Sequence, residues 1–260
     1  MKKYKIAFIG AGNVATHLSN ELKKCGHEMV QVYSRTEESA KQLADSLHTT
    51  FTTSTETITK EADIYIVALK DSAVDQVLSK IGFGDKLLVH CSGSLPMSVL
   101  SQYAKNYGVF YPLQTFSKNR KVDFKQIPIF VEASSKGNQH ILEEIAHEVS
   151  KSVTVLDSEK RKSLHIAAVF ACNFANHCYA MAAKYLETKE LPFEILRPLI
   201  METAQKVQEL HPKDAQTGPA IRFDENIIKS HLSELKEMSD LQELYNSISK
   251  SIFEHHQEKQ

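Results

Sequence analysis

The chain has 260 residues, of which 42% are hydrophobic, and this length fits either one large domain or two ordinary ones. Lysine and arginine number 31 and aspartate and glutamate 32, so the net charge is −1. This balance is typical neither of a nucleic-acid-binding protein nor of a polybasic protein at a membrane surface, so we expect no nucleic-acid partner.

Cysteine and histidine are scattered along the chain rather than grouped. The four cysteines, Cys25, Cys91, Cys172 and Cys178, form no C-x-x-C pair. We expect reduced thiols in a cytoplasmic protein rather than a disulfide framework. The twelve histidines form no H-x-x-x-H or similar ligand set, and no metal site is expected.

The first 157 residues alternate between apolar strands and amphipathic helices. Strands are expected at Tyr4–Ile9, Glu28–Tyr33, Thr49–Thr52, Asp63–Leu69, Leu87–His90, Val109–Tyr111, Ile129–Glu132 and Val153–Leu156, and helices at Asn13–Lys24, Thr36–Leu47 and Gln139–Ser150. Several strands are apolar throughout, as in strands that are covered on both faces. The alternation predicts a doubly wound, parallel α/β sheet of the Rossmann type.

The rest of the chain has a helical period. Only one of the nine glycines lies beyond position 137. We expect an all-α domain over residues 158–260, following the Rossmann domain of residues 1–157. Its helices are predicted at about 157–189, 193–210, 225–238 and 240–256. Asp157 or Ser158 can cap the first helix, and Pro198 kinks the second or delays its start.

The first of these helices contains a long uncharged run. Residues 163–183 carry no charge, and 21 positions are about enough to span a bilayer. Polar residues within the run, among them His165, Asn173 and Asn176, would penalise insertion. We therefore expect no membrane partner, and a helix covered either inside the protein or by a second copy in a homodimer.

The first strand leads directly into GAGNVA at residues 10–15, a G-x-G-x-x-A dinucleotide fingerprint. Gly10 permits the tight turn, Gly12 leaves room for a pyrophosphate, and Ala15 lets the helix lie close to the sheet. The N–H groups of the first helical turn, which contains Asn13 and Val14, would face the phosphates. A purely structural glycine turn is the alternative.

The end of the second strand indicates the cofactor. Related NAD enzymes place an acidic residue about 20 residues after the glycines, where it binds the ribose 2′-hydroxyl. Here the strand ends in Ser34, Arg35 and Thr36, which suit a 2′-phosphate. We expect NADP rather than NAD, with a solvated arginine in a turn as the alternative; Glu37 and Glu38 follow closely.

These motifs, with ADIYIVALKD, give the N-terminal part a resemblance to relatives of pyrroline-5-carboxylate reductase and of deazaflavin-dependent NADP oxidoreductases. The C-terminal part resembles an all-helical domain of unknown function that accompanies such domains. The matching stretches are HCSGSLP (90–96), YPLQTF (111–116), LHIAAVFACNF (164–174) and QTGPAIRFD (216–224). The resemblance implies an NADP oxidoreductase and leaves the substrate open.

The chain departs from the family pattern at three places. The family has His-Pro where this chain has Tyr111-Pro112, and a tyrosine hydroxyl can still donate a hydrogen bond. The family also has Leu-Thr-Gly-Pro and Arg-Gly-Asp where this chain has QTGP (216–219) and RFD (222–224). The first difference puts in doubt any mechanism that needs a histidine at position 111.

Loops after strands supply further candidates, because ligands bind at the carboxyl edge of such sheets. Beside the cofactor we expect Leu69 and Lys70, and beside the substrate Ser92, Gly93, Tyr111, Gln114 and Thr115. The Ser92-Gly93 pair resembles the Ser-Gly substrate loop of β-hydroxyacid dehydrogenases. Ordinary turn chemistry is the alternative for each residue.

The helical part supplies the candidates for catalysis. Related dehydrogenases place a Lys or Asn on the first long helix, facing the nicotinamide, and Asn173 is the candidate here. His165 is a candidate proton donor, although a regular α-helix places it about 80° round and about 12 Å along the axis from Asn173. Arg222 is expected to bind a substrate carboxylate. The alternatives are polar groups satisfied in a core or interface, and a surface arginine.

The leading hypothesis is an NADP(H)-dependent oxidoreductase that transfers a hydride to or from a small, anionic carbonyl or imine compound. The alternative is a non-catalytic NADP(H)-binding sensor or partner protein on the same fold, because the fold alone does not decide function. The spacing of residues identifies no acid or base by itself, and the reaction direction stays open.

Overall fold

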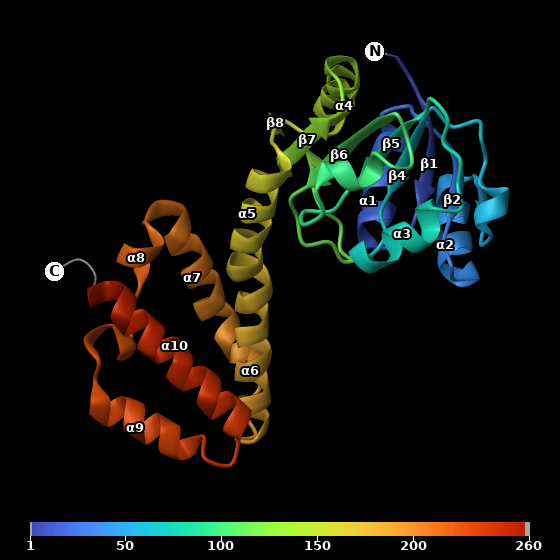
Figure 1. The fold of residues 1–260 in the computed structure, drawn as a ribbon. Helices are drawn as coiled ribbons and strands as arrows, with labels where there is room; N and C mark the ends of the chain where they lie inside the picture. The colour runs from blue at the N-terminus through green and yellow to red at the C-terminus, as the bar shows by residue number, and fades with distance from the viewer. Residues whose placement is uncertain (1, 258–260) are drawn as a thin grey trace. The chain divides into compact units, whose positions relative to one another are not determined.

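A computed structural model of the protein describes residues 2–257, which form two compact units that divide between Cys172 and Asn173. The first unit contains one sheet of eight strands in the order β3-β2-β1-β4-β5-β6-β7-β8 (Figure 1). The strands are β1 (Lys5–Ile9), β2 (Glu28–Tyr33), β3 (Thr50–Thr52), β4 (Ile64–Val67), β5 (Leu87–His90), β6 (Asn106–Pro112), β7 (Ile129–Ala133) and β8 (Val153–Val155). The predicted domain boundary at residues 157 and 158 stays a prediction.

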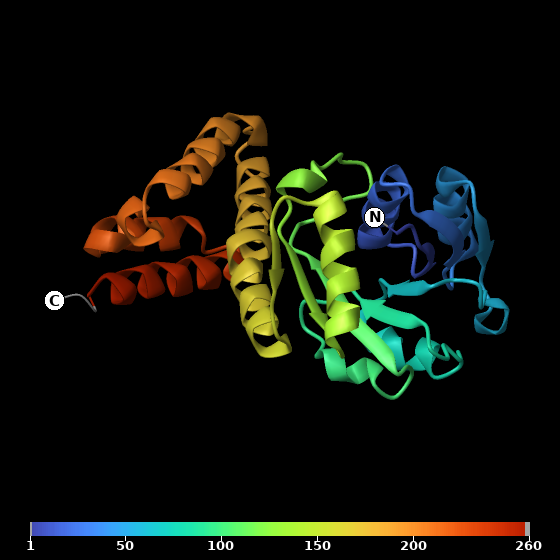
Figure 2. The same cartoon turned by 90° about the horizontal axis from the view of Figure 1, so that it is seen from above.

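Helices cover both faces of this sheet, which confirms the doubly wound Rossmann-type arrangement. All four residues of β4 are buried, and successive side chains enter opposite core clusters, Ile64 with Ile66 and Tyr65 with Val67. One face packs against α1 (Asn13–Lys24), α2 (Glu37–Leu47) and α4 (Lys136–Val149), and the other against α3 (Val74–Leu78) and the 3-10 helix η3 (Met97–Leu100). Helix α4 lies across β6 and β7 (Figure 2).

The sheet is parallel, as predicted, except at one pair of strands. β7 runs antiparallel to β6, with Tyr111 opposite Phe130, whereas the other neighbours are parallel. A parallel neighbour needs a crossover connection, usually an α-helix. Residues 113–128, all described, contain only the 3-10 helix η4 (Phe124–Gln126) and begin and end at the same edge of the sheet, because Pro112 pairs with Ile129, so β7 returns in the opposite direction.

The long helix begins at α5 (Ser158–Ala168), and Asp157 rather than Ser158 supplies the cap. The Asp157 carboxylate accepts a hydrogen bond from the N–H of Lys160 at 2.8 Å. This hydrogen bond holds the pKa of Asp157 below its usual value. The Ser158 hydroxyl is used elsewhere, in a network with β7.

The predicted long helix is confirmed over Ser158–Glu187, but its middle is not a regular α-helix. Val169–Phe174 form a six-residue π-helical segment, η5, before α6 (Ala175–Glu187) continues. Hydrogen bonds in a π-helix join residues five apart instead of four. The angle and distance calculated for His165 and Asn173 in a regular α-helix therefore do not apply.

The same helix carries an exposed apolar surface. The helix over Ser158–Glu187 is long enough to cross a membrane, and an 18-residue stretch of it has a mean hydropathy of 1.2. None of that stretch is buried within the chain. The core helices of soluble proteins and signal sequences meet the same criteria of length and hydropathy. The side chain of Ile166 is 52% exposed. Burial of the uncharged run, residues 163–183, inside its own chain is therefore not observed, and burial against a second copy stays a prediction.

The second unit is helical, as predicted. It consists of α6, η6 (Phe193–Leu196), α7 (Arg197–Glu209), α8 (Pro212–Ala215), η7 (Ala220–Arg222), α9 (Glu225–Glu234) and α10 (Ser239–Gln257). Pro198 lies in the first turn of α7, so it delays the start of the helix and does not kink it. The Asp224 carboxylate caps α9 by accepting a hydrogen bond from the N–H of Ile227.

Candidate functional site

The parallel strands β1, β4 and β5 end at one edge of the sheet, and the chain that follows them surrounds a cavity of about 220 Å³. The cavity is lined by Gly12, Asn13, Val14, Val67, Ala68, Leu69, Lys70, Asp71, Val74, His90, Cys91, Ser92 and Leu95. Six residues predicted from the sequence to bind cofactor or substrate, Gly12, Asn13, Val14, Leu69, Lys70 and Ser92, thus share one cavity. That they bind a ligand stays a prediction.

The two glycines of the turn differ in what the protein itself requires. Gly10 has φ +121°, donates its N–H to the carbonyl of Tyr33, and lies so close to β4 that an added Cβ would be 2.3 Å from the carbonyl oxygen of Ala68. Gly12 has an extended backbone, and an added Cβ would meet no atom within 4 Å. The fold requires Gly10, whereas the space beside Gly12 is open.

The start of α1 presents a helix N-terminus to this open space. Gly12 is the N-cap, and no side chain caps the helix. Ala15 is fully buried, so the helix lies close to the sheet. Free N–H groups and the positive end of the helix dipole favour an anion here.

Beside the glycine turn, β2 ends in the residues that were predicted to bind a 2′-phosphate. Ile9 pairs with Tyr33, so Ser34, Arg35 and Thr36 follow the strand next to β1. The N–H of Thr36 donates to the Ser34 hydroxyl at 3.3 Å. Arg35 is exposed and has no ion-pair partner within residues 2–257, so its guanidinium is available to an anion.

Gly93, Tyr111 and His165 come together although they are far apart in the sequence. The Tyr111 hydroxyl and His165 Nδ1 are joined by a hydrogen bond of 3.0 Å, and the two rings meet edge to face. A Cβ on Gly93 would lie 2.7 Å from His165 Nδ1 and 2.8 Å from Tyr111 Cζ. Only glycine fits between the loop after β5 and this pair.

The surroundings of Tyr111 affect its acidity. Tyr111 is 8% exposed at the end of β6, and burial raises the pKa of its phenol. The guanidinium of Arg161 acts in the opposite direction and limits this increase in pKa. The phenol is therefore protonated at neutral pH and can donate its proton or a hydrogen bond.

The loop after β6 contacts α1 rather than the cavity. The Asn13 side-chain amide donates to the carbonyl of Phe116 at 2.7 Å, and His17 Nε2 donates to the carbonyl of Ser117 at 2.9 Å. The exposed Gln114 and Thr115 hydrogen-bond to each other. None of the described cavity-lining residues comes from this loop, and the substrate contacts predicted for Gln114 and Thr115 stay predictions.

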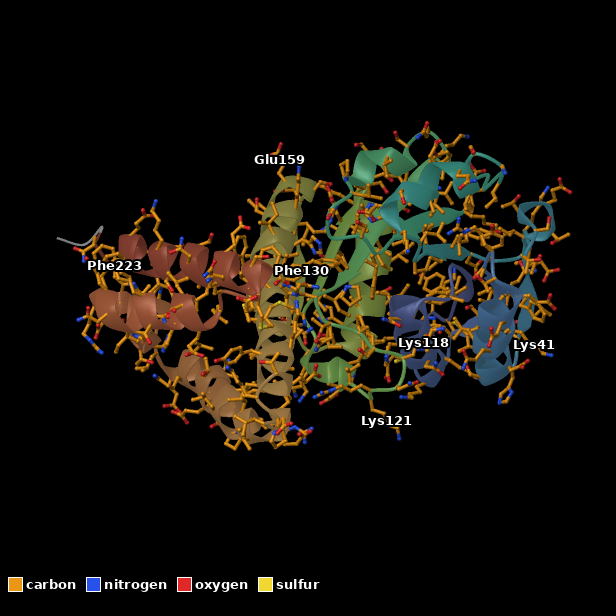
Figure 3. All side chains as sticks on the ribbon, turned by 90° about the horizontal axis from the view of Figure 1, so that it is seen from below. Lys41, Lys118, Lys121, Phe130, Glu159 and Phe223 are labelled. Carbon is orange, nitrogen blue, oxygen red and sulfur yellow. The ribbon has the colours of Figure 1, made fainter. Side chains whose placement is uncertain are left out.

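The same loop is basic at its tip. Lys118, Arg120 and Lys121 are all exposed, and Lys121 projects away from the ribbon in the stick view (Figure 3). Because the loop is held on the first helix, these cations belong to the same unit as the cavity.

Two predicted site residues belong to the second unit. Asn173 is exposed within η5, and Arg222 is exposed at the end of η7. Their predicted roles, towards the nicotinamide and towards a substrate carboxylate, stay predictions.

His90 is a buried residue of the cavity wall that the sequence did not single out. It is 1% exposed, and its Nδ1 accepts a hydrogen bond from the N–H of Ser92 at 3.1 Å. Burial, followed by the nearby cation of Arg161, lowers the pKa of His90 to about 4. The imidazole is therefore neutral at pH 7, and it fixes the start of the loop that contains Gly93.

Cys91 follows directly and is buried as well. It is 8% exposed, and burial raises the pKa of its thiol to about 12. Nothing in the sequence distinguished Cys91 from the other three cysteines or indicated that it lies in a cavity wall.

The ion pair between Arg161 and Glu132 was also missed. Arg161 lies in the charged stretch SEKRKS at the start of α5, which is typical of a solvated helical turn, yet its side chain is 1% exposed. Residue spacing could have indicated this burial, because Arg161 precedes His165 by four residues and lies on the same face of the helix.

Two family models match the chain. Residues 5–93 match "NADP oxidoreductase coenzyme F420-dependent", and residues 127–252 match "Domain of unknown function (DUF2520)". The crystal structure of a "putative NADP oxidoreductase" from Bacteroides fragilis is 52% identical in sequence. It covers 97% of this chain and 98% of its own, with a TM-score of 0.94. No curated protein matches the sequence.

More distant structures share the fold. A 1-pyrroline-5-carboxylate reductase from Streptococcus pyogenes is 14% identical, with 97% of this chain and 99% of that chain covered and a TM-score of 0.63. An imine reductase from Myxococcus stipitatus, solved in complex with NADP+, is 15% identical, with 98% and 93% covered and a TM-score of 0.64.

The two glycines give a matched pair of variants. Gly12→Val should leave the melting temperature near that of the wild type, because the new side chain meets only open space, and should weaken NADPH binding at least a hundredfold by filling that space. Gly10→Ala should instead destabilise the fold by about 1–3 kcal/mol or more, through a strained backbone and a clash with Ala68. Calorimetry and NADPH fluorescence titration measure both effects. Unchanged NADPH affinity in Gly12→Val would rule out this cavity as the pyrophosphate site.

Proposed function

The chain belongs to the family in which an NADP oxidoreductase domain is followed by a DUF2520 domain, and we propose that it transfers a hydride between NADP(H) and a small carbonyl or imine compound. The resemblance found in GAGNVA, SRT and ADIYIVALKD is confirmed by these matches. The 52% identical relative supports the proposal over both parts of the chain, because 97% of the chain is covered.

The residues of the first unit fit a bound dinucleotide. The open space at Gly12 and the uncapped start of α1 suit a pyrophosphate, and Arg35 at the end of β2 suits the 2′-phosphate. The cavity continues along Leu69 and Lys70 to Ser92, where a nicotinamide ring would lie at the carboxyl edge of the sheet. When bound, NADPH supplies the hydride.

The hydrogen-bonded pair of Tyr111 and His165 is the observation that carries the proposal of catalysis. Reduction of a carbonyl carbon by hydride leaves a negative charge on oxygen, and that oxygen needs a proton. The pair presents one protonated phenol in contact with an imidazole, beside Gly93 and one residue beyond the cavity-lining Ser92. In our proposal these two side chains deliver the proton, and water restores it.

The substrate is proposed to be small and anionic. The exposed Lys118, Arg120 and Lys121 supply positive charge beside the first helix of the nucleotide unit. From the second unit, Arg222 is proposed to bind a substrate carboxylate and Asn173 to face the nicotinamide. We also propose a cytoplasmic location.

The choice of cofactor is tested at Arg35. Arg35→Ala should remove one charge-assisted phosphate contact, worth about 1.5–3 kcal/mol, and so weaken NADPH binding about tenfold to a hundredfold while leaving NADH binding unchanged. Lys60→Ala is a suitable control, because Lys60 is also exposed but precedes β4 at the opposite edge of the sheet. Equal affinities for NADPH and NADH in the wild type would contradict this assignment.

Catalysis is tested at the Tyr111–His165 pair. Turnover is first sought by following NADPH oxidation with a panel of 2-oxo acids, cyclic imines and aldehydes. Tyr111→Phe and His165→Ala should each lower kcat by about 10²–10⁴-fold, because proton transfer is lost, and should leave NADPH affinity within about twofold of the wild type. Tyr111→His, which restores the family's usual residue, should retain more activity than Tyr111→Phe. Intact NADPH binding with no turnover across the panel would favour the alternative, a non-catalytic NADP(H)-binding protein.

A homodimer is proposed from the exposed apolar side chains of the helical part. Ile195, Leu199 and Met201 are 55%, 64% and 58% exposed, and they add to the apolar surface of the preceding long helix. Exposed apolar side chains in such numbers often mark an interface, and two-fold dimers are the commonest assembly. Light scattering at micromolar concentration should give twice the mass of one chain, and Leu199→Glu should shift the protein towards monomer. A wild-type monomer at these concentrations would refute the proposal.

A further inference from the structure

Arg161 is a buried cation to which the proposed chemistry assigns no role. Its side chain is 1% exposed, and it is among the largest fully buried side chains of the described chain. Removing a guanidinium from water is costly unless it is paired and hydrogen-bonded, and apolar residues often replace buried ion pairs without loss of stability. The contacts of Arg161 should therefore explain why a charge is buried at this place.

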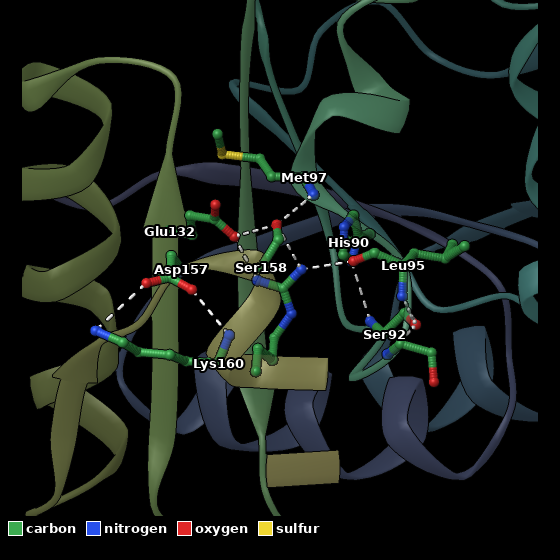
Figure 4. A network of polar contacts seen from close by, with 10 residues as sticks. His90, Ser92, Leu95, Met97, Glu132, Asp157, Ser158 and Lys160 are labelled. Carbon is green, nitrogen blue, oxygen red and sulfur yellow. Dashed lines mark hydrogen bonds and ion pairs between the residues drawn. The ribbon is translucent and has the colours of Figure 1, made fainter. Parts of the chain in front are cut away.

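The guanidinium of Arg161 joins three segments of the chain, and its partners Glu132, Leu95 and Ser158 are labelled in Figure 4. Nη1 donates to the carboxylate of Glu132 on β7, and Nη2 donates to the carbonyl of Leu95, each at 2.5 Å. Nη2 also lies 3.2 Å from the hydroxyl of Ser158, which itself donates to Glu132 at 2.7 Å. Arg161 thus ties the first turn of α5 to β7 and to the loop after β5.

The loop after β5 is held by His90 at its start and by Arg161 with Ser158 at its end. At its start, the N–H of Ser92 donates to His90, and the Ser92 hydroxyl accepts from the N–H groups of Ser94 and Leu95. At its end, the carbonyl of Leu95 accepts from Arg161, and the N–H of Met97 donates to Ser158 at 2.8 Å (Figure 4). Gly93 lies between these fixed points.

The position of this loop matters because of the space around Gly93. There is no room for even one carbon atom between Gly93 and the pair formed by His165 and Tyr111. His165 is one helical turn after Arg161 on α5, so a single helix carries both the group that holds the loop and the group that the loop contacts. The same cation opposes the effect of burial on the phenol of Tyr111.

We propose that Arg161 is a positioning residue, which holds the Gly93 loop against the Tyr111–His165 pair and supplies a fixed positive charge beside it. The proposal rests on the proposed function for the claim that this pair moves a proton. The geometric part is independent of turnover, because it concerns the state of Tyr111 and His165 in the protein without substrate.

The test must distinguish positioning by Arg161 from a purely stabilising role, so both charges of the Arg161–Glu132 ion pair are removed together. Arg161→Met alone leaves the half-buried carboxylate of Glu132 without its partner and is expected to unfold more easily than the wild type. The double variant Arg161→Met/Glu132→Gln removes both charges and keeps an acceptor for Ser158, so its melting temperature is expected near that of the wild type. Lys162→Met is the matched control, because it removes the neighbouring exposed cation of the same helical turn.

Two measurements on each variant decide the proposal. The first is the ionisation of Tyr111 with pH, read from ultraviolet difference spectra against Tyr111→Phe in the same background. The second is the imidazole nitrogen resonance of His165, assigned by His165→Gln. In the folded double variant we expect Tyr111 to ionise at higher pH and the His165 resonance to move, with NADPH affinity within about twofold of the wild type. Lys162→Met should change neither.

Gly93→Ala tests the same contact from the other side. The added carbon should displace the Tyr111–His165 pair, and so move the His165 resonance, while the Arg161–Glu132 ion pair stays in place.

If the double variant is folded and both signals match the wild type, Arg161 is only structural and the proposal fails. If the signals move as expected but no substrate is turned over, the positioning role stands and the proposed function fails. If a substrate is found, kcat of the double variant should fall at least tenfold, with partial recovery in Arg161→Lys.

Discussion

The parallel pairing of β1 with β2 on one side and β4 on the other determines where everything else in the nucleotide unit lies. Because these strands run in the same direction, the glycine turn, the Ser34–Thr36 segment and the loop after β4 all emerge at one edge. The close approach of Gly10 to the carbonyl of Ala68 is the tightest point of this arrangement. Strand pairing alone thus brings together a helix N-terminus, an exposed arginine and the open space beside Gly12.

Much of this arrangement could be predicted from the sequence, because the signals are local. Apolar runs separated by turn residues identify strands, and the two glycines with Ala15 identify the turn between β1 and α1. The loop residues Leu69, Lys70 and Ser92 follow from strand ends alone. Their place at the cavity depends only on strand direction, which the alternation of strands and helices indicates.

The missed features depend on contacts that sequence spacing does not encode. β7 is antiparallel because the loop before it, residues 113–128, starts and ends at the same edge of the sheet, and the sequence pattern of β7 itself carries no direction. The π-helical segment at Val169–Phe174 lies between His165 and Asn173, so their separation cannot be calculated from regular α-helical geometry. Asn13 fits the fingerprint, yet its amide is bonded to the carbonyl of Phe116, a residue more than a hundred positions away. Burial of Arg161 within a charged stretch is likewise a property of its partners Glu132 and Leu95.

The buried thiol of Cys91 has a consequence for chemical labelling. With a pKa of about 12, only about one molecule in 10⁵ carries the thiolate at pH 7, and the thiolate is the form that reacts with alkylating agents and oxidants. Cys172 and Cys178 are exposed on the long helix and Cys25 is partly buried. A thiol probe or a spin label will therefore leave the cavity wall unmodified and react on the helix, where labelling slows if a second copy covers Cys172 and Cys178. Slow labelling of Cys91, in turn, measures how often that wall opens.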